Sequence, residues 1–406
     1  MKTAIQQLEY LKRGVADLVS EKELLFKLER SVKENKPLRV KFGIDPTSPD
    51  VHLGHTVPMH KLKQFQELGH HIVIIIGSYT AMVGDPTGKN TTRPQLSKEM
   101  VMENAKDYQK KIFRILDEKK TEVVYNGDWF SKFTFNDVIK LTSRITVASL
   151  LEHDNFDNRF KAGTPISLHE FLYPLLQGWD SVVVKADVEL GGTDQRFNVI
   201  VGRDFQRESG QESQVGLFLP ILTGLDGKNK MGKSLNNYIA MDETPKEMFG
   251  KLMSIPDTLM TSYFELLTGV SLAEIKALEK GIQDGTLHPK EVKKRLAREI
   301  VTIYHDKAAA QTAEAEFENV FKEKALPADI PECTLGEDAF KEGKIWIINL
   351  LMLSGAVSNK SEARRLVDQG AVYINDIRIE NPDTDLAVKT GDIVKAGKRK
   401  YFRLKV

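Results

Sequence analysis

The spacing of apolar residues predicts an alternation of strands and helices in the first part of the chain. Residues 38–42 form a short apolar run typical of a strand, and Ile72–Ile76 is the continuous β-branched run of a strand buried on both faces. Between them, from about Gly54 to Leu68, apolar residues recur at the three-to-four spacing of an amphipathic helix that ends at Gly69. This order predicts a βαβ unit, and therefore a parallel sheet with a right-handed crossover.

The same alternation continues downstream. We expect a helical lead-in over residues 3–36, a further helix over residues 98–118 and a helical insertion over residues 135–161. Three further strands are expected over residues 122–126, 187–191 and 218–222. After residue 234 the chain becomes helical throughout, and a Pro-bearing acidic linker follows. The predicted domains are 1–234 with the insertion, an α-helical domain at 235–325, a linker at 326–340 and a small α+β module at 341–406. In the last module we expect a helix opening at Lys360, a strand over residues 370–375 and a strand pair about a Gly turn at 388–394.

Composition narrows the class of protein. The 406 residues include 58 basic and 57 acidic side chains, which excludes a protein that coats nucleic acid through an overall basic charge. The single cysteine, Cys333, cannot form an internal disulfide, and no Cys/His cluster has metal-ligand spacing. No signal peptide opens the chain and no apolar run is long enough to cross a bilayer, so we expect a cytoplasmic protein with no membrane partner.

Two loops carry candidate chemistry. The first strand ends in a turn rich in Gly, Pro and Asp, and His52 and His55 then stand three apart at a helix start, where backbone amides favour anions. Far downstream, Lys230 and Lys233 lie in the loop Lys-Met-Gly-Lys-Ser234. Taken alone, the histidines could cap a helix and the lysines could be solvated.

Other polar groups follow predicted strands or interrupt an apolar helix. Asp85, Lys89 and Arg93 come off the carboxyl end of the second strand, and ligands bind at such ends. Tyr173, Gln177 and Asp180 form one polar stripe on a helix, which is either an internal hydrogen-bond network or a binding site. Gly192-Thr-Asp-Gln195 forms another strand-to-helix corner, where glycine admits a ligand and Asp194 can accept from ribose hydroxyls.

In this order and spacing, Gly43-x-Asp45-Pro-Thr47, His52-Leu-Gly-His55, Gly84-Asp85-Pro, Tyr173-x-x-x-Gln177-x-x-Asp180, Gly192-Thr-Asp-Gln195 and Lys230-Met-Gly-Lys-Ser234 resemble the tyrosyl-tRNA synthetases, a family of class I aminoacyl-tRNA synthetases. The resemblance covers essentially the whole chain and implies a Rossmann-like catalytic domain. Tryptophanyl-tRNA synthetases share this fold and are the nearest alternative. An acidic side chain in the side-chain pocket favours tyrosine, because its phenol needs an acceptor.

The resemblance implies roles for particular residues. It implies a tyrosine site formed by Lys41, Asp85, Tyr173, Gln177, Asp180 and Gln195. It implies an ATP site formed by Asp45, Thr47, His52, His55, Lys89, Arg93, Gly192, Asp194, Lys230 and Lys233, of which Thr47, both histidines and both loop lysines are catalytic. Lys41 stands where the family commonly has an aromatic residue, and Glu189 where it often has Gln. These departures resemble a second bacterial subtype.

The implied activity has two steps. Tyrosine reacts with ATP to give tyrosyl-adenylate and pyrophosphate, and tyrosine then passes to the 3′ end of tRNA(Tyr). The resemblance implies Mg²⁺ with ATP, no tightly bound cofactor, and a homodimer formed through the insertion. It also implies anticodon recognition by the helical domain and an S4-like RNA-binding module carrying Lys360, Arg364 and Arg365. Residues 341–406 hold 13 basic and 8 acidic side chains, a net charge of +5. An RNA-binding protein on an inactive synthetase scaffold is the alternative.

Overall fold

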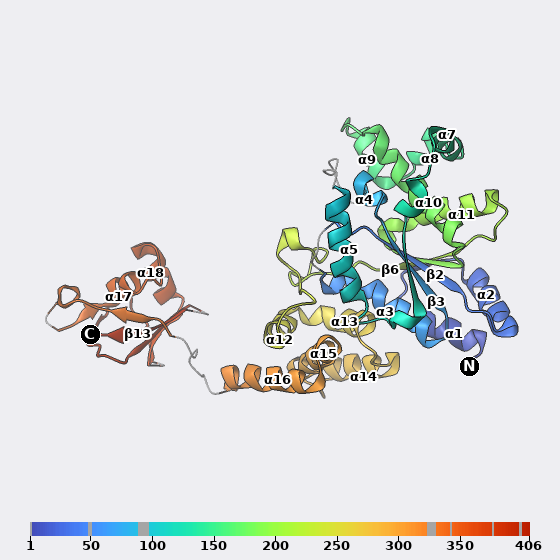
Figure 1. Cartoon of the computed structure of the whole chain (residues 1–406). Helices are drawn as coiled ribbons and strands as arrows, with labels where there is room; N and C mark the ends of the chain where they lie inside the picture. Colours follow the sequence, from blue (N-terminus) through green and yellow to red (C-terminus); the bar gives the residue numbers. More distant parts are fainter. Residues whose placement is uncertain are drawn as a thin grey trace. The chain divides into compact units, whose positions relative to one another are not determined.

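The computed structural model describes residues 2–47, 51–87, 97–322, 330–341, 343–375, 377–397 and 400–406. The chain forms two compact units, Met1–Glu314 and Ala315–Val406 (Figure 1). Each unit has its own sheet and its own apolar core. Within the described residues, no helix combines the length and apolarity needed to cross a membrane.

The first unit is built on a six-stranded sheet with the order β1-β6-β5-β2-β3-β4. Its strands are β1 Asp17–Val19, β2 Arg39–Ile44, β3 His71–Ile76, β4 Thr121–Tyr125, β5 Val188–Gly192 and β6 Val215–Leu219. All neighbours from β4 to β6 pair in parallel, as predicted, and β1 pairs antiparallel with β6. The prediction that residues 3–36 are helical was incomplete. They form α1 Ala4–Leu11 and α2 Glu21–Glu34 with β1 between them, because a three-residue edge strand carries too little periodic signal.

The sheet has helices on both faces. α3 Leu53–Glu67 connects β2 to β3, and α11 Arg196–Glu208 connects β5 to β6. β2 and β5 are neighbours, and these two crossovers leave them in opposite directions, so right-handed connections place α3 and α11 on opposite faces (Figure 1). α10 Leu172–Val184 packs beside α11. The boundary between β2 and β5 is the point where strand order reverses, the usual ligand position in such sheets.

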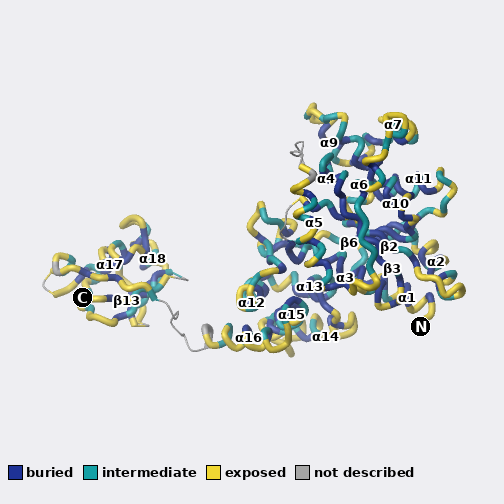
Figure 2. Tube along the Cα trace, in the orientation of Figure 1, coloured by how far each residue is buried: buried dark blue, intermediate teal, exposed yellow. Residues whose placement is uncertain are grey.

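The core follows the central strands of the sheet, which are mostly dark blue in Figure 2, whereas the edge strands β1 and β4 are only partly buried. Residues Ile72–Ile76 of β3 are 0–1% exposed, which explains the unbroken β-branched run. Each such side chain contributes about 1.5–3 kcal/mol by leaving water.

Further helices complete the first unit. Around the insertion lie α4 Thr80–Val83, α5 Lys98–Ile112, α6 Gly127–Phe130, α7 Phe135–Thr142, α8 Val147–Leu150 and α9 Asp154–Lys161. After β6 come α12 Pro245–Ser254, α13 Met260–Leu267, α14 Leu272–Gln283, α15 Pro289–Tyr304 and α16 Lys307–Lys322. Short 3₁₀ turns occupy Glu118–Lys120, Leu168–Phe171, Thr193–Gln195, Lys233–Leu235 and Asp257–Leu259 in the first unit, and Glu337–Ala339 in the second. The Tyr304 hydroxyl donates to Thr56 Oγ1 over 2.8 Å, which joins α15 to α3.

The second unit contains a five-stranded sheet with the order β10-β9-β12-β13-β7, a two-stranded sheet of β11 and β8, the end of α16, and the helices α17 and α18. Its elements are β7 Glu332–Thr334, β8 Ile345–Trp346, α17 Ile347–Leu353, α18 Lys360–Asp368, β9 Val372–Ile374, β10 Ile377–Arg378, β11 Asp385–Leu386, β12 Ile393–Ala396 and β13 Lys400–Lys405. β7 lies inside the segment predicted as a linker, yet it pairs in parallel with β13. The prediction of a strand pair about Gly391 was wrong. Asp392 Oδ2 accepts from the Lys389 amide over 2.9 Å and holds a turn there, and β12 pairs with β13 instead.

Candidate functional site

A cavity of about 830 Å³ lies at the carboxyl ends of β2 and β5. Its walls contain Lys41 and residues of all six sequence motifs: Asp45, Thr47, His52, His55, Asp85, Tyr173, Gln177, Asp180, Gly192, Asp194, Gln195, Lys230 and Lys233. Side chains separated by up to 192 positions, Lys41 and Lys233, therefore share one chamber at the switch point of the sheet. Lys89 and Arg93 lie outside the described residues.

Backbone pairing brings the two motif loops together. The chain after the lysine loop runs antiparallel to the start of α3: the Leu53 amide donates to Ile239 O over 3.0 Å, and the Met241 amide donates to Val51 O over 2.8 Å. The lysine loop is fixed at its other end by the Met231 amide, which donates to Leu222 O over 2.8 Å. These bonds hold the two loops together, and the charge of Lys233 acts on both imidazoles.

The two imidazoles lie at the N-terminus of α3, where His52 is the N-cap residue. Their rings stack with centroids 3.8 Å apart, and the His52 amide donates to His55 Nδ1 over 3.3 Å. Burial and then the charge of Lys233 lower the pKa of His52 to about 4. Burial, His52 and Lys233 lower the pKa of His55 to about 3. Both rings are therefore neutral near pH 7 and offer hydrogen bonds rather than charge.

A buried carboxylate lies at the other end of the cavity. Asp180 of α10 is 4% exposed; its Oδ2 accepts from Asn126 Nδ2 over 3.2 Å and its Oδ1 accepts from Trp129 Nε1 over 3.0 Å. Burial raises the pKa of Asp180 to about 7, while the Lys41 charge and the two donors oppose that rise. The group is a buried acceptor in the cavity wall that can bind a donor entering the cavity.

Between the carboxylate and the imidazoles, polar side chains orient one another. Tyr173 OH donates to Asp45 Oδ2 over 2.8 Å, and Gln195 Nε2 donates to Asp85 Oδ2 over 2.9 Å. Asn198 Nδ2 donates to the Oε1 atoms of Gln177 and Gln195, over 3.1 Å each. The stripe of Tyr173, Gln177 and Asp180 is therefore both an internal network and a cavity wall.

A glycine explains how Asp45 fits at the end of β2. A Cβ atom at Gly77, the residue after β3, would overlap the Asp45 carboxylate. Thr80 Oγ1 donates to Asp45 Oδ1 over 2.7 Å from the same turn. The carboxylate is thus held against backbone, with one oxygen bound by Thr80 and the other by Tyr173.

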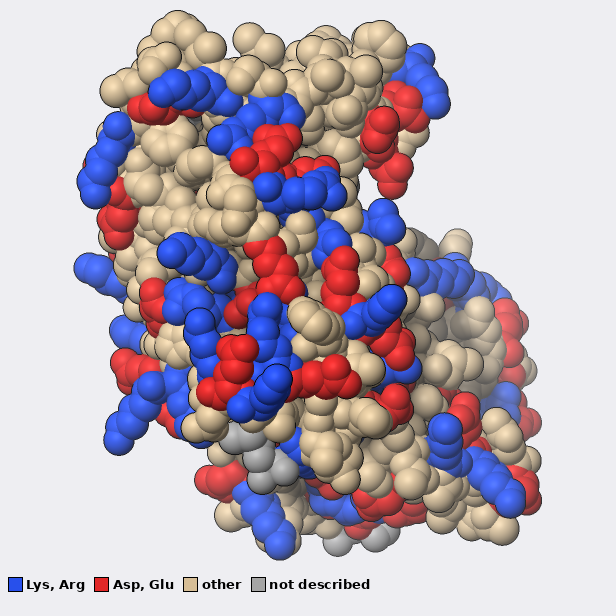
Figure 3. All heavy atoms as spheres, turned by 90° about the vertical axis from the view of Figure 1, so that its right-hand side faces the viewer, with Lys and Arg blue, Asp and Glu red and all other residues tan. Residues whose placement is uncertain are grey.

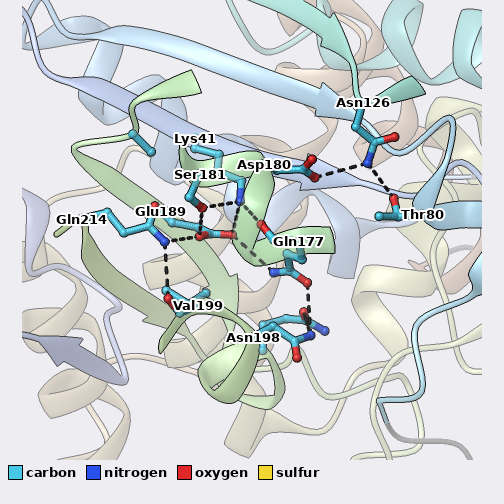
Figure 4. A network of polar contacts seen from close by, with 12 residues as sticks. Lys41, Thr80, Asn126, Gln177, Asp180, Ser181, Glu189, Asn198, Val199 and Gln214 are labelled. Atoms are coloured by element: carbon cyan, nitrogen blue, oxygen red, sulfur yellow. Dashed lines mark hydrogen bonds and ion pairs between the residues drawn. The ribbon is translucent and has the colours of Figure 1, made fainter. Parts of the chain in front are cut away.

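Lys41 and Glu189 form a buried ion pair at the cavity wall (Figure 4). Their side chains are 0% and 1% exposed, and Lys41 Nζ lies 2.8 Å from Glu189 Oε1. Lys41 Nζ also donates to Ser181 Oγ over 2.7 Å and to the Gln177 carbonyl over 2.9 Å. The three donor protons of the Lys41 ammonium therefore face three acceptors of the protein itself. The contact between Lys41 and tyrosine stays a prediction.

The sequence did not single out Asn126, Trp129, Ser181, Asn198 or Gln214, all of which support cavity residues. Asn126 directly follows β4, and a polar residue at a strand end is the only local signal among them.

The predicted RNA-contacting residues lie in the second unit. Lys360, Arg364 and Arg365 are exposed on α18. The Lys360 ammonium and the Arg364 guanidinium lie 5.6 and 5.5 Å from the Trp346 ring centroid, and Arg364 NH2 lies 2.8 Å from Asp383 Oδ1. Trp346 therefore supports a cationic helix face.

Comparisons with known proteins cover nearly the whole chain. Residues 33–322 match the family model for tRNA synthetases class I (W and Y), and residues 322–404 match the Tyrosine--tRNA ligase SYY-like C-terminal domain. The Tyrosine--tRNA ligase of Moorella thermoacetica is 53% identical over 399 residues, which cover 98% of this chain and 95% of the relative. That of Carboxydothermus hydrogenoformans is 53% identical over 402 residues, covering 98% and 97%.

Solved structures share the fold. A C-terminally truncated mitochondrial tyrosyl-tRNA synthetase from Aspergillus nidulans superposes with a TM-score of 0.64 at 22% identity, covering 79% of this chain and 95% of that one. The tyrosyl-tRNA synthetase complexed with L-tyrosine from Archaeoglobus fulgidus superposes with a TM-score of 0.60 at 23% identity, covering 77% and 99%.

Proposed function

We propose how this chain, which belongs to the tyrosine--tRNA ligase family of class I tRNA synthetases, distributes its reaction over the cavity. It is an enzyme that uses ATP to join tyrosine to tRNA. The observation that carries the assignment of residues is the single cavity with a buried carboxylate at one end and imidazoles facing lysines at the other.

At the carboxylate end, we assign the tyrosine side chain to Asp180, which accepts from the phenol hydroxyl. Asn126 and Trp129 support this role, because both donate to the carboxylate and favour its ionised form. Asp85, Tyr173 and Gln177 hold the substrate ammonium, and Gln195 contacts the carboxyl group, which places it near the phosphates. Phenylalanine has no phenol hydroxyl, so it would leave Asp180 without that hydrogen-bond donor. Rejection of phenylalanine through such unpaired buried groups is a known feature of this enzyme family.

At the other end, we assign ATP to Asp45, Thr47, His52, His55, Gly192, Asp194, Lys230 and Lys233. A carboxylate oxygen of tyrosine attacks the α-phosphorus, and the bond from that phosphorus to the bridging oxygen of pyrophosphate breaks. Neutral imidazoles donate to oxygens that gain charge, and the lysines stabilise the departing pyrophosphate. Lys89 and Arg93 remain predicted to join them. Mg²⁺ prefers phosphate oxygens and water, so we propose that it arrives with ATP.

For tRNA, we propose anticodon recognition by residues 235–325 and RNA binding by residues 341–406, with the linker between them. Lys360, Arg364 and Arg365 support this, since exposed cations on one helix attract phosphates. Recognition would depend on backbone and shape more than on base edges.

We also propose a homodimer, located in the cytoplasm, with its interface on the insertion. Large apolar side chains are exposed there: Phe135 by 79%, Val147 by 64% and Phe160 by 65%, and Leu168, which follows the insertion, by 82%. Figure 3 is consistent with this, because the upper end of the face, at the level of α7–α9, is largely free of charged side chains. Several large apolar side chains exposed on one segment favour a protein partner.

The test is exchange of labelled pyrophosphate into ATP, with each amino acid in turn. Tyrosine alone is expected to support it. Exchange with tryptophan and not tyrosine would overturn the substrate assignment. A protein silent with every amino acid would favour the alternative, an RNA-binding protein on an inactive scaffold.

A further inference from the structure

The Lys41–Glu189 pair has an unusual place for two charges. Lys41 comes from β2, Glu189 from β5, and both side chains are fully buried beside a cavity. Burying an ion pair costs desolvation free energy, so it is weak evidence for added stability. The orientation of the pair has a more specific consequence, because the carboxylate, and not the ammonium, contacts the side-chain amide of Gln177.

Glu189 determines how the Gln177 amide is turned. An ionised carboxylate can only accept hydrogen bonds, and Glu189 Oε1 accepts from Gln177 Nε2 over 3.3 Å. Gln177 Oε1 is therefore turned away, toward Asn198 Nδ2 at 3.1 Å, as Figure 4 shows. This orientation leaves a carbonyl oxygen, and not an NH₂ group, on the side away from the ion pair.

Lys41 keeps Glu189 in this role. Its ammonium binds Glu189 Oε1, the oxygen that accepts from the Gln177 side chain, and it also donates to the backbone carbonyl of Gln177. Ser181 Oγ donates to Glu189 Oε2 over 3.0 Å, and Gln214 Nε2 donates to the same oxygen. The carboxylate is thus surrounded by donors, which favours its ionised form.

We propose that Lys41 and Glu189 are positioning residues for tyrosine binding, which lock the Gln177 amide with its oxygen toward the substrate ammonium. The inference rests on the proposed function, in which Gln177 is part of the ammonium site. It gives Lys41 a role that needs no contact with the phenol.

The test removes both charges together, because removal of one leaves the other buried and unpaired. In Lys41→Met/Glu189→Met, Gln177 Nε2 loses its acceptor and the amide can turn its NH₂ group toward the ammonium. Asp204→Asn/Arg207→Gln on α11 is the matched control, because it also removes one charge of each sign, but at a solvent-exposed ion pair. In the double variant, the opposite effects of Lys41 and Glu189 on the pKa of Asp180 offset one another in part.

Two ligands separate positioning from a general change in pocket shape. L-Tyrosine carries the ammonium, whereas 3-(4-hydroxyphenyl)propanoate has the same phenol and carboxylate without it. The double variant is expected to raise the Kd of tyrosine about tenfold, the scale of a hydrogen bond to a charged group. The Kd of the analogue should change less than about twofold, and Asp204→Asn/Arg207→Gln should leave both Kd values within about threefold of the wild type.

Equal loss of both ligands, or no loss of tyrosine, would overturn the inference. If the double variant does not fold, as judged by its thermal unfolding, Lys41→Met/Glu189→Gln keeps a hydrogen-bonding amide without a cation to orient it. That variant should show a smaller loss, about threefold and again confined to tyrosine. Wild-type protein that fails to bind tyrosine would overturn the proposed function itself, whereas normal wild-type binding with an unchanged ligand ratio would overturn only this inference.

Discussion

Replacing Asp180 by Asn is expected to remove a loss of stability that the first unit of the wild type undergoes between pH 5 and pH 8. It also replaces the carboxylate proposed to accept from the phenol by a neutral amide. Burial raises the pKa of Asp180 from 3.8 to about 7 in the folded protein. The folded state therefore binds this proton more tightly than the unfolded state does. The stability linked to protonated Asp180 is fully present below pH 3.8 and is lost as the pH rises through about 7.

The magnitude follows from the shift. At about 1.4 kcal/mol per pKa unit, the loss reaches about 4 kcal/mol at pH 8, and about 2 to 3 kcal/mol of it falls between pH 5 and pH 8. Asn does not titrate in this range, so Asp180→Asn should lack this part of the pH dependence. Any cost of re-orienting the Asn126 amide, on the order of 1 kcal/mol, is the same at both pH values and cancels.

The measurement is urea unfolding at pH 5 and pH 8, followed by tryptophan fluorescence. In a Trp346→Phe background, Trp129 and Trp179 report on the first unit alone. Asp204→Asn on α11 removes a half-exposed carboxylate and serves as the charge control. If wild type and Asp180→Asn lose stability in parallel between the two pH values, the raised pKa of Asp180 is refuted.

Three further predictions concern activity and assembly. His52→Ala should slow adenylate formation about 100-fold, the effect of losing one hydrogen-bond donor to the transition state, and should leave the Kd of tyrosine unchanged. An equal loss of tyrosine affinity in equilibrium binding would refute the assignment of His52 to the phosphates. Phe160→Asp should convert the proposed dimer to monomers in sedimentation, and an unchanged mass would exclude α9 from the interface. A chain that ends at Lys322 should keep tyrosine-dependent pyrophosphate exchange and lose most tRNA charging, whereas loss of both would make the second unit necessary for the first to fold.

Local patterns were sufficient where one face of an element decides its structure. β3 and α3 were predicted within a few residues, because Ile72–Ile76 has no polar position and α3 keeps a helical apolar period. β1 was missed because its strand character comes from pairing with the edge of β6. The strand predicted on the N-terminal side of the Gly391 turn was wrong, because the Asp392 carboxylate accepts from the Lys389 amide and holds that segment in the turn.

The candidate site divides in the same way. Residues at strand ends and helix starts, such as Asp45 and His52, were found because ligand sites gather there and because the motifs resemble a known family. Trp129 and Gln214 were not found, since each contributes through a partner more than 20 positions away. The lysine at position 41 was noticed as a departure, but its counter-ion on another strand became apparent only from the fold.

The antiparallel pairing of residues 239–241 with residues 51–53 fixes the distance between the two loops of the reaction centre, whatever the length of the chain that connects them. Because these short backbone segments fix one loop against the other directly, the long stretch between them could gain or lose surface elements without altering their distance. The same pairing would confine any movement of the lysine loop to the sixteen residues between Leu222 and Ile239.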